Sequence, residues 1–266
     1  MSGEPLAGGL ANAGAVVRIG EVVERPAPPH AAALHAHLDG LRRRGFDGAP
    51  TSVRLSPDGR REQVTYIPGE VALPPFPGWA MTDDALRSVG ALLRRMHDAA
   101  REFPAGVDWS GEFADPDARG AGLVLCHNDV CPENVVFRAG RAAALIDFDM
   151  AAPGRPVWDV ALTAGYWAPL LDPLSASAHY PAGLDPVHRL TVLADAYGLG
   201  ADERAALPAV IEQAVGVCRA FVARRLAAGD APFVNAHAAK GGWARWDRRQ
   251  AWLAERREDF LAALTG

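Results

Sequence analysis

Residues 123–152 read LVLCHNDVCPENVVFRAGRAAALIDFDMAA, in which apolar runs alternate with clusters of polar side chains. The apolar segments 135–137 and 142–146 flank a short connection, Arg138-Ala139-Gly140-Arg141. Its glycine can take the positive φ that a tight turn between two strands requires. The pattern therefore predicts a β-hairpin in the middle of the chain.

Three polar residues surround this hairpin. Asn134 at its entrance and Asp147 at its exit should lie side by side, and Asp129 precedes both on the loop before the hairpin. An amide oxygen beside a carboxylate suits Mg²⁺, which takes oxygen ligands from one or two side chains and from substrate phosphates. Asp129 would then face the group to which the phosphate is presented and accept its hydroxyl proton. We therefore expect Asn134 and Asp147 as metal ligands and Asp129 as the catalytic base.

This spacing resembles the catalytic core of the protein kinases, in which an Asp and, four residues later, an Asn precede the metal-binding Asp of a hairpin. It is still more similar to the aminoglycoside phosphotransferase and choline kinase-like family, whose pattern is His-Gly-Asp, four residues, Asn, then Ile-Asp-Phe or Trp-Asp. Here Asn128 replaces the usual glycine, and the matching residues are His127-Asn128-Asp129, Asn134 and Ile146-Asp147-Phe148-Asp149.

The resemblance implies an α+β, two-lobe protein kinase-like fold with a small β-rich N-lobe and a larger, mainly helical C-lobe. We expect the N-lobe at residues 1–67, a proline-rich hinge or linker at 68–78 and the C-lobe at 79–266. The resemblance also implies ATP or GTP with Mg²⁺ as cofactors, and it implies that His127, beside Asp129 in the catalytic loop, is a second catalytic residue.

In the related kinases a lysine of the third strand holds the nucleotide phosphates, but Lys240 is the only lysine of this chain. Arg25 is nearest to that position, and Arg18 on the preceding predicted strand is a second candidate. Either side chain can hold a phosphate through two hydrogen bonds. The glycine-rich turn around Gly9 could bring backbone N–H groups to a phosphate.

The family pattern has two further N-lobe features. By the resemblance, the backbone groups of Thr65 and Ile67 would meet the adenine edge. The lysine also pairs with a glutamate of the following helix, yet the helix predicted after Pro29 offers His35 and His37 and no glutamate. Because residues two apart on a helix point to different faces, we expect these histidines to be surface residues rather than metal ligands.

Beyond the hairpin, Asp159 stands where the family has an Asp-Leu-Ala-like triplet. The resemblance implies that Asp159 is buried and holds the catalytic loop through backbone N–H groups, and a helix N-cap is a compatible alternative. We expect His97 to make structural hydrogen bonds. The acceptor pocket would lie between the catalytic loop and the C-terminal helices. Its candidate residues, for which a place in the core is the alternative, are Asp149, Trp158, Tyr166, Trp167, Trp243 and Trp246.

Composition limits the function. A chain of 266 residues with 49% hydrophobic residues can bury a substantial core, and its net charge of −5 gives no basic face for nucleic acid. Its mild acidity would suit a cationic substrate. No membrane-length apolar run and no secretory signal are evident, and three cysteines without metal-ligand spacing favour the cytoplasm. We expect a monomer or homodimer.

Two functions from different classes fit these observations. The first is ATP- and Mg²⁺-dependent phosphoryl transfer to a hydroxyl of a small molecule, such as an aminoglycoside or nucleoside antibiotic, which would give antibiotic resistance. The second is a catalytically silent, kinase-like binding or immunity protein that sequesters a ligand. The missing lysine and glutamate favour the second function, whereas the complete set of Asp129, Asn134 and Asp147 favours the first. Nucleotidyl transfer is a third, weaker alternative.

Overall fold

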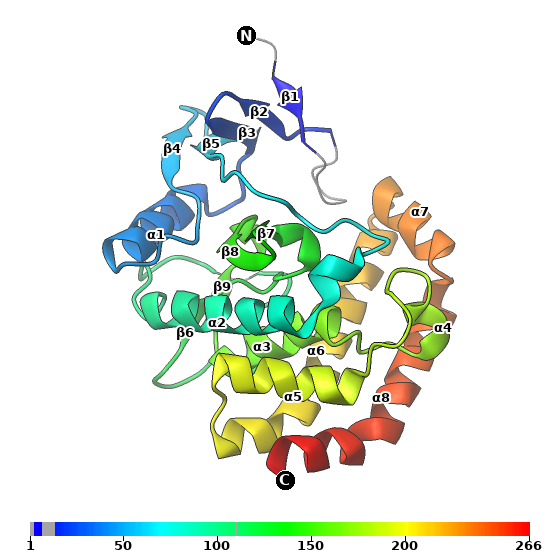
Figure 1. The fold of residues 1–266 in the computed structure, drawn as a ribbon. Coiled ribbons are helices and arrows are strands. Elements are labelled where there is room, and N and C mark those ends of the chain that lie inside the picture. Colours follow the sequence, from blue (N-terminus) through cyan, green and yellow to red (C-terminus); the bar gives the residue numbers. More distant parts are fainter. Residues whose placement is uncertain (1–2, 7–13, 110) are drawn as a thin grey trace.

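An antiparallel sheet lies at one end of the molecule and a larger helical part at the other (Figure 1). The computed structural model describes residues 3–6, 14–109 and 111–266. The sheet has five strands in the order β1-β2-β3-β5-β4. The strands are β1 (Glu4–Pro5), β2 (Val17–Ile19), β3 (Val22–Pro26), β4 (Ser52–Leu55) and β5 (Arg61–Thr65). This confirms the predicted α+β architecture with a small β-rich part and a mainly helical remainder.

Helix α1 (Ala31–Arg43) connects β3 to β4 and is covered on two sides. It turns Leu34, Leu38 and Leu41 into the core, as their spacing predicts. The prediction that His35 and His37 are surface residues is wrong, because both side chains are buried. Leucines at helical spacing mark only one buried stripe, whereas this helix packs on β4 and also on the C-lobe helix α2.

The C-lobe is built from helices around one hydrophobic core. Helix α2 illustrates why they form: Thr82 caps it by accepting a 3.2 Å hydrogen bond from the N–H of Ala85, and Asp83 and Asp84 occupy its positive end. The helices are α2 (Asp83–Ala99), α3 (Pro156–Trp167), α4 (Pro173–Ala176), α5 (Pro186–Tyr197), α6 (Ala201–Ala227), α7 (Ala231–Ala239) and α8 (Gly242–Thr265).

The predicted hairpin is present as β7 (Val135–Arg138) and β8 (Arg141–Leu145). Its turn residues Ala139 and Gly140 both have positive φ, the conformation of a two-residue turn that matches the twist of the strands. Strands β6 (Val124–Cys126) and β9 (Ala152–Gly154) also pair, so the two ends of the central stretch meet beneath the hairpin. Short 3₁₀ turns at Pro132–Asn134 and Phe148–Met150 lie beside the hairpin mouth.

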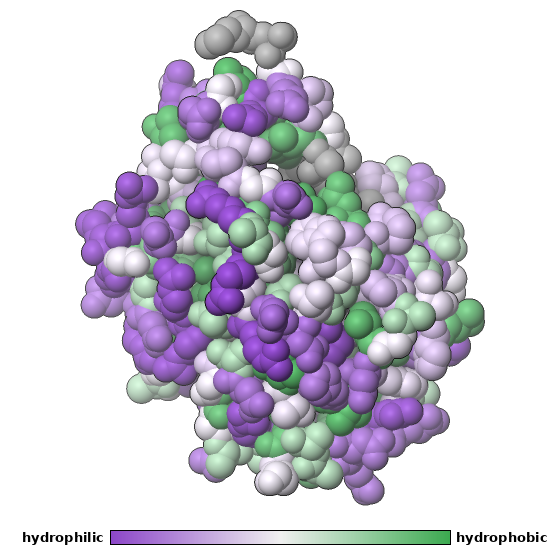
Figure 2. All heavy atoms as spheres, viewed as in Figure 1, coloured by the Kyte–Doolittle hydropathy of each residue, from purple (hydrophilic) through white to green (hydrophobic). Residues whose placement is uncertain are grey.

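Helix α6 is long and apolar enough, by length and composition, to cross a membrane, which was not expected from the sequence. Of its most apolar window, 39% is buried inside the protein, and the helix packs against α3 and α8. On the face seen in Figure 2, hydrophilic side chains cover much of the surface and hydrophobic ones form small separate groups. A core helix of a globular protein passes the same test of length and composition.

Candidate functional site

A cavity of about 880 Å³ runs from the sheet, past the hairpin mouth, into the helical part. At the sheet end its wall includes Val23, Arg25, Val64, Thr65 and Ile67. In its middle lie Asp129, Asn134 and Asp147. Its far end is walled by residues of α3, α6 and α8. The three polar residues singled out from the sequence therefore share one cavity.

Asn134 holds Asp129 in place. Its side-chain Nδ2 donates to Oδ2 of Asp129 at 3.0 Å and to the carbonyl oxygen of the same residue at 2.9 Å. The hydroxyl of Tyr166 donates to Oδ1 of Asp129 at 3.1 Å. The carboxylate thus has a fixed orientation, as a proton acceptor requires.

The environment of Asp129 raises its proton affinity. Burial and the nearby negative charge of Asp147 raise the pKa of Asp129 to about 7, although Tyr166 and Asn134 act in the opposite direction. A carboxyl group with a pKa near neutrality binds a proton more readily than an ordinary aspartate. This property suits a general base that works near pH 7.

His127 does not belong to the wall of the cavity. It is fully buried, its Nε2 lies 3.0 Å from the carbonyl oxygen of Ile146, and its Nδ1 accepts from the N–H of Asp129 at 3.3 Å. Burial lowers the pKa of His127, and because Nδ1 accepts a hydrogen bond, the ring in this arrangement carries its proton on Nε2 and donates through it. The expectation of a catalytic His127 is therefore corrected: this ring ties the catalytic loop to the strand that carries Asp147.

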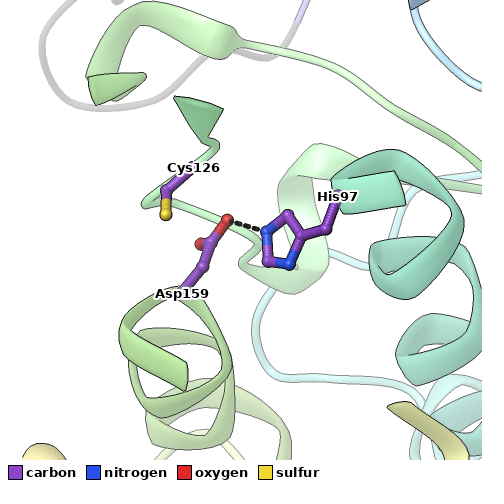
Figure 3. A group of neighbouring side chains, drawn as sticks. All are labelled: His97, Cys126 and Asp159. Atoms are coloured by element: carbon purple, nitrogen blue, oxygen red, sulfur yellow. Dashed lines mark hydrogen bonds and ion pairs between the residues drawn. The ribbon is translucent and has the colours of Figure 1, made fainter. Parts of the chain in front are cut away.

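Asp159 supports the same loop from below (Figure 3). Its Oδ2 accepts from the N–H of His127 at 2.7 Å and its Oδ1 from the N–H of Asn128 at 2.9 Å, as the resemblance implied. His97 Nε2 lies 2.9 Å from Oδ2. The ligand atoms of His97, Cys126 and Asp159 lie within 4.8 Å of one another, as in a metal site. Because both carboxylate oxygens already accept hydrogen bonds, the cluster is a brace for the loop rather than a set of free ligands.

Arg25, the first candidate to replace the missing lysine, lines the sheet end of the cavity, and its partners were not foreseen. Its guanidinium lies 2.7 Å from each of three carboxylates, those of Glu62, Asp147 and Asp149. Glu62 is buried on β5 directly opposite Arg25, and its second oxygen contacts Nε2 of His35 on α1 at 2.7 Å. The carboxylate of the family pattern is thus supplied by the neighbouring strand, and the helix supplies a histidine.

The residues at the hairpin mouth fit a hard divalent cation. Nδ2 of Asn134 is engaged by Asp129, which leaves its amide oxygen as the available ligand atom, and Asp147 offers a carboxylate beside it in the cavity wall. Oxygen donors of this kind, next to space for phosphate groups, are what Mg²⁺ requires. One oxygen of Asp147 contacts Arg25. A bound cation would therefore share this carboxylate with the guanidinium.

Of the other residues predicted to bind the nucleotide, two line the cavity and one does not. Thr65 and Ile67 line the cavity beside Arg25. Arg18 does not belong to its wall, because its guanidinium stacks on the ring of Tyr66 at 3.8 Å and donates to the carbonyl oxygen of Gly20. Gly9 lies outside the described residues.

Of the acceptor-pocket candidates, Tyr166 and Trp246 line the cavity. The other four candidates do not line the cavity, so their assignment to the acceptor pocket is corrected. The Trp158 and Trp167 rings are fully buried in the core, and their N–H groups donate to backbone carbonyls. Trp243 is partly exposed, with its ring against Arg219 and His237. Asp149 pairs with Arg25 instead. Aromatic residues at helical spacing fill the core as readily as a pocket, which explains the error.

Comparisons with known proteins identify the family and the fold. A model of the phosphotransferase enzyme family matches residues 109–186, which include the whole hairpin β7–β8. A choline/ethanolamine kinase family protein from Mesorhizobium loti superposes with a TM-score of 0.67 at 19% identity, over 100% of this chain and 92% of that one. Aminoglycoside 2'-phosphotransferase-IIIa, in its GDP complex, superposes with a TM-score of 0.56 at 16% identity, over 97% and 93% of the two chains. At these identities, the likeness shows the kinase-like fold.

A relative in sequence is the trifolitoxin immunity protein of Rhizobium leguminosarum bv. trifolii. It is 34% identical over 199 residues, which are 71% of this chain and 72% of that protein. The match to the family model, the sequence relative and the kinase-like fold together lead to one conclusion. This chain belongs to the phosphotransferase enzyme family, whose solved relatives include aminoglycoside phosphotransferases and choline kinase-like proteins.

Proposed function

We propose that this protein transfers the terminal phosphoryl group of ATP or GTP, with Mg²⁺, to a hydroxyl group of a small molecule. The observation that carries the proposal is the joint position of Asp129, Asn134 and Asp147 in the wall of one cavity. A binding protein has no need of all three residues, including a carboxylate fixed by two hydrogen-bond donors at the centre of its cavity. A phosphotransferase requires it, because catalysis in this class rests on position and charge.

In the proposed arrangement, the nucleotide occupies the sheet end of the cavity. Its adenine or guanine would lie near Thr65 and Ile67, at the start of the proposed hinge 68–78, and its phosphates near Arg25. Asn134 and Asp147 would hold Mg²⁺, which neutralises charge on the phosphates when bound. Arg25 would stabilise the phosphates through its delocalised positive charge.

Asp129 would receive the acceptor hydroxyl. This hydroxyl donates to Oδ1 of Asp129 in the space beside Tyr166, and its oxygen forms the new bond to phosphorus as the bond to the leaving nucleoside diphosphate breaks. The hydroxyl proton passes to Asp129 and then to solvent. Asn134 keeps the carboxylate oriented during this step.

A second candidate function is supported by the relative named for immunity to trifolitoxin. In this alternative the protein protects its host by binding a toxic ligand in the far part of the cavity without modifying it. Phosphorylation of such a ligand would combine both functions, as antibiotic resistance. The three cysteines are free, which supports a place for either activity in the reducing cytoplasm.

The two functions differ in their products. The protein is incubated with Mg²⁺, ATP or GTP, and a mixture of antibiotics and metabolites that carry hydroxyl groups. Mass spectrometry then searches for products heavier by one phosphate, and a coupled assay follows release of nucleoside diphosphate. Phosphorylated product with stoichiometric diphosphate supports phosphoryl transfer. Ligand retained unchanged on the protein, with no diphosphate, would support sequestration, and release of pyrophosphate would indicate nucleotidyl transfer.

A further inference from the structure

The far end of the cavity, beyond Asp129, combines apolar walls with a group of cations. Its apolar residues come from α3 and α6, and they include Leu162, Ile211, Val215 and Phe221. Three cationic side chains from the α7–α8 region face the same space, namely Lys240, Arg245 and Arg249. We call these three residues the cation cluster.

Among the described residues, the three side chains of the cation cluster form no ion pair. In the part of the chain that the structure describes, no carboxylate lies within ion-pair distance of Lys240, Arg245 or Arg249. Residues 1–2, 7–13 and 110, which lie outside the description, include no Asp or Glu. Arg249 makes one hydrogen bond, from Nε to the carbonyl oxygen of Leu170 at 2.8 Å. The contrast with Arg248 is clear, because that neighbour pairs with Asp172.

The pKa values of the cation cluster are those of positive groups that have lost solvent and repel one another. Burial lowers the pKa of Arg249, and burial together with the charge of Arg249 lowers the pKa of Arg245. Partial desolvation and the charge of Arg245 do the same to the pKa of Lys240, although this side chain is exposed at the rim. The positive potential also reaches His179, whose pKa is lowered by burial and by Lys240 and Arg245. An anion among these groups would replace lost solvation and relieve their mutual repulsion.

The acidic residues of the cavity lie at its catalytic part. Asp129, Glu133 and Asp147 line that part, and Lys240 is attracted weakly to Glu133 without forming an ion pair. A ligand whose hydroxyl reaches Asp129 would thus place its remote end among cations and its middle against apolar side chains. A polycationic acceptor would meet repulsion at that remote end.

We propose that the acceptor is a hydroxylated compound with an apolar body and one anionic group, a carboxylate or a phosphate, which the cation cluster binds. This inference rests on the proposed function, because it assumes that the hydroxyl of the ligand reaches Asp129. It separates the protein from kinases of polycationic antibiotics and of choline. Arg249 is the principal anion ligand, Arg245 assists it, and Lys240 closes the site at the exposed rim.

A pair of fluorescent probes tests the charge preference without nucleotide. The anionic probe is 8-anilinonaphthalene-1-sulfonate, and the neutral probe N-phenyl-1-naphthylamine has the same aromatic body without the sulfonate. The protein should bind the anionic probe at least tenfold more tightly. Arg249→Gln should weaken binding of the anionic probe about tenfold, the effect of about 1.4 kcal/mol, and leave the neutral probe unchanged within twofold.

Two further variants secure this result. Lys240→Gln, at an exposed position where folding is insensitive, should weaken binding of the anionic probe severalfold. Arg256→Gln is the matched control, because Arg256 lies on the same helix, is about half exposed and pairs with Asp259. The inference is overturned if both probes bind equally well, or if Arg249→Gln and Arg256→Gln have the same effect.

Competition with the anionic probe then shows whether the anionic group of the ligand is a carboxylate or a phosphate. 3-Hydroxydecanoate represents carboxylates, 1-naphthyl phosphate represents phosphate esters, and kanamycin and choline represent cations. Displacement by either anion supports the proposal and names the anionic group. Displacement by the cations alone overturns it. The probe measurements contain no nucleotide, so they test the preference for anions separately from phosphoryl transfer. If the protein prefers anions but releases no diphosphate with any acceptor, phosphoryl transfer is refuted and the preference for anions still stands.

Discussion

The guanidinium Nη1 of Arg25 lies 2.7 Å from Oδ1 of Asp147, and this contact joins the N-terminal sheet to the catalytic hairpin. The same guanidinium contacts Glu62, which is almost completely buried. In the proposed enzyme, Arg25 has two duties. It neutralises carboxylates when the cavity is empty, and it contacts phosphates when nucleotide is bound.

Arg25→Met should therefore weaken nucleotide binding more than tenfold and also lower the free energy of unfolding by about 3 kcal/mol, because it leaves Glu62 buried without its cation. Arg25→Lys keeps the charge but loses the planar fork of the guanidinium, so it should show losses that are real but smaller than those of Arg25→Met. Titration with a non-hydrolysable ATP analogue and urea unfolding measure both effects. The control is Arg61→Met, which removes an arginine from an exposed pair with Glu24 on the same sheet. Unchanged affinity in Arg25→Met would remove Arg25 from the nucleotide site.

Asp129→Asn should lower kcat by about 10²- to 10⁴-fold, the usual contribution of a positioned base. The amide that replaces the carboxylate can still accept a hydrogen bond from Asn134, so the loop should keep its shape. Nucleotide affinity should stay within twofold of the original value. Single-turnover kinetics with the acceptor found by mass spectrometry measure the rate, and a rate equal to that of the unsubstituted protein would refute the role of Asp129.

Asp147→Asn should be at least as damaging as Asp129→Asn, because it removes a charge from the proposed metal site and from the partner of Arg25. The Mg²⁺ concentration needed for half-maximal nucleotide binding should rise at least tenfold. Asp149→Asn is the matched control, since it also takes a carboxylate from Arg25 but does not line the cavity. Equal Mg²⁺ dependence in the two variants would show that Asp147 acts only as a partner of Arg25.

Asp159→Asn should impair both folding and rate. Its carboxylate accepts from two backbone N–H groups and contacts the ring of His97, and an amide can replace only one of the two acceptor oxygens. We expect a loss of about 3 kcal/mol in the free energy of unfolding, as for a broken buried network. Urea unfolding measures the loss, and Asp185→Asn, at an exposed helix cap, is the control. Equal stability of the two variants would contradict the role of Asp159 as a brace.

The hairpin could be predicted because its signal is local. Two apolar runs, a turn with Gly140, and the spacing of Asn134 and Asp147 are contained in one short stretch of chain. Once the strands pair, the relative positions of the polar residues at the mouth of the hairpin are fixed. The same holds for α2, whose cap at Thr82 and apolar spacing lie within one segment.

Glu62 could not be predicted in this way. Its pairing with Arg25 depends on β3 and β5 being neighbours, although a helix and another strand separate them in sequence. A glutamate on a predicted strand ordinarily indicates a solvent-facing position, and only the register of the folded sheet reverses that reading. The anionic acceptor that we propose could not be predicted for another reason. Net charge describes the whole surface, whereas Arg245 and Arg249, four residues apart on one helix face, were the informative pair.

Stability should fall on acidification because of His37. This side chain is buried beside Arg44, and burial first and the charge of Arg44 second lower the pKa of His37 from 6.5 to about 4. The unfolded chain therefore binds the proton more readily than the folded protein. The stabilising contribution is complete above pH 6.5 and is lost as the pH falls from 6.5 towards 4. Between pH 7 and pH 5 the free energy of unfolding should fall by about 2 kcal/mol because of His37.

Urea unfolding of the original protein and of His37→Leu at both pH values isolates this contribution. Leucine is uncharged at either pH and is close to histidine in size, so the variant should lose about 2 kcal/mol less on acidification. The other buried histidines titrate in both proteins, and their effect cancels in the difference. An equal loss in the two proteins would mean that His37 takes up its proton in the folded state as readily as in the unfolded chain. In that case the acid sensitivity would have to come from other groups, such as His127 beneath the catalytic loop, whose pKa is also lowered by burial.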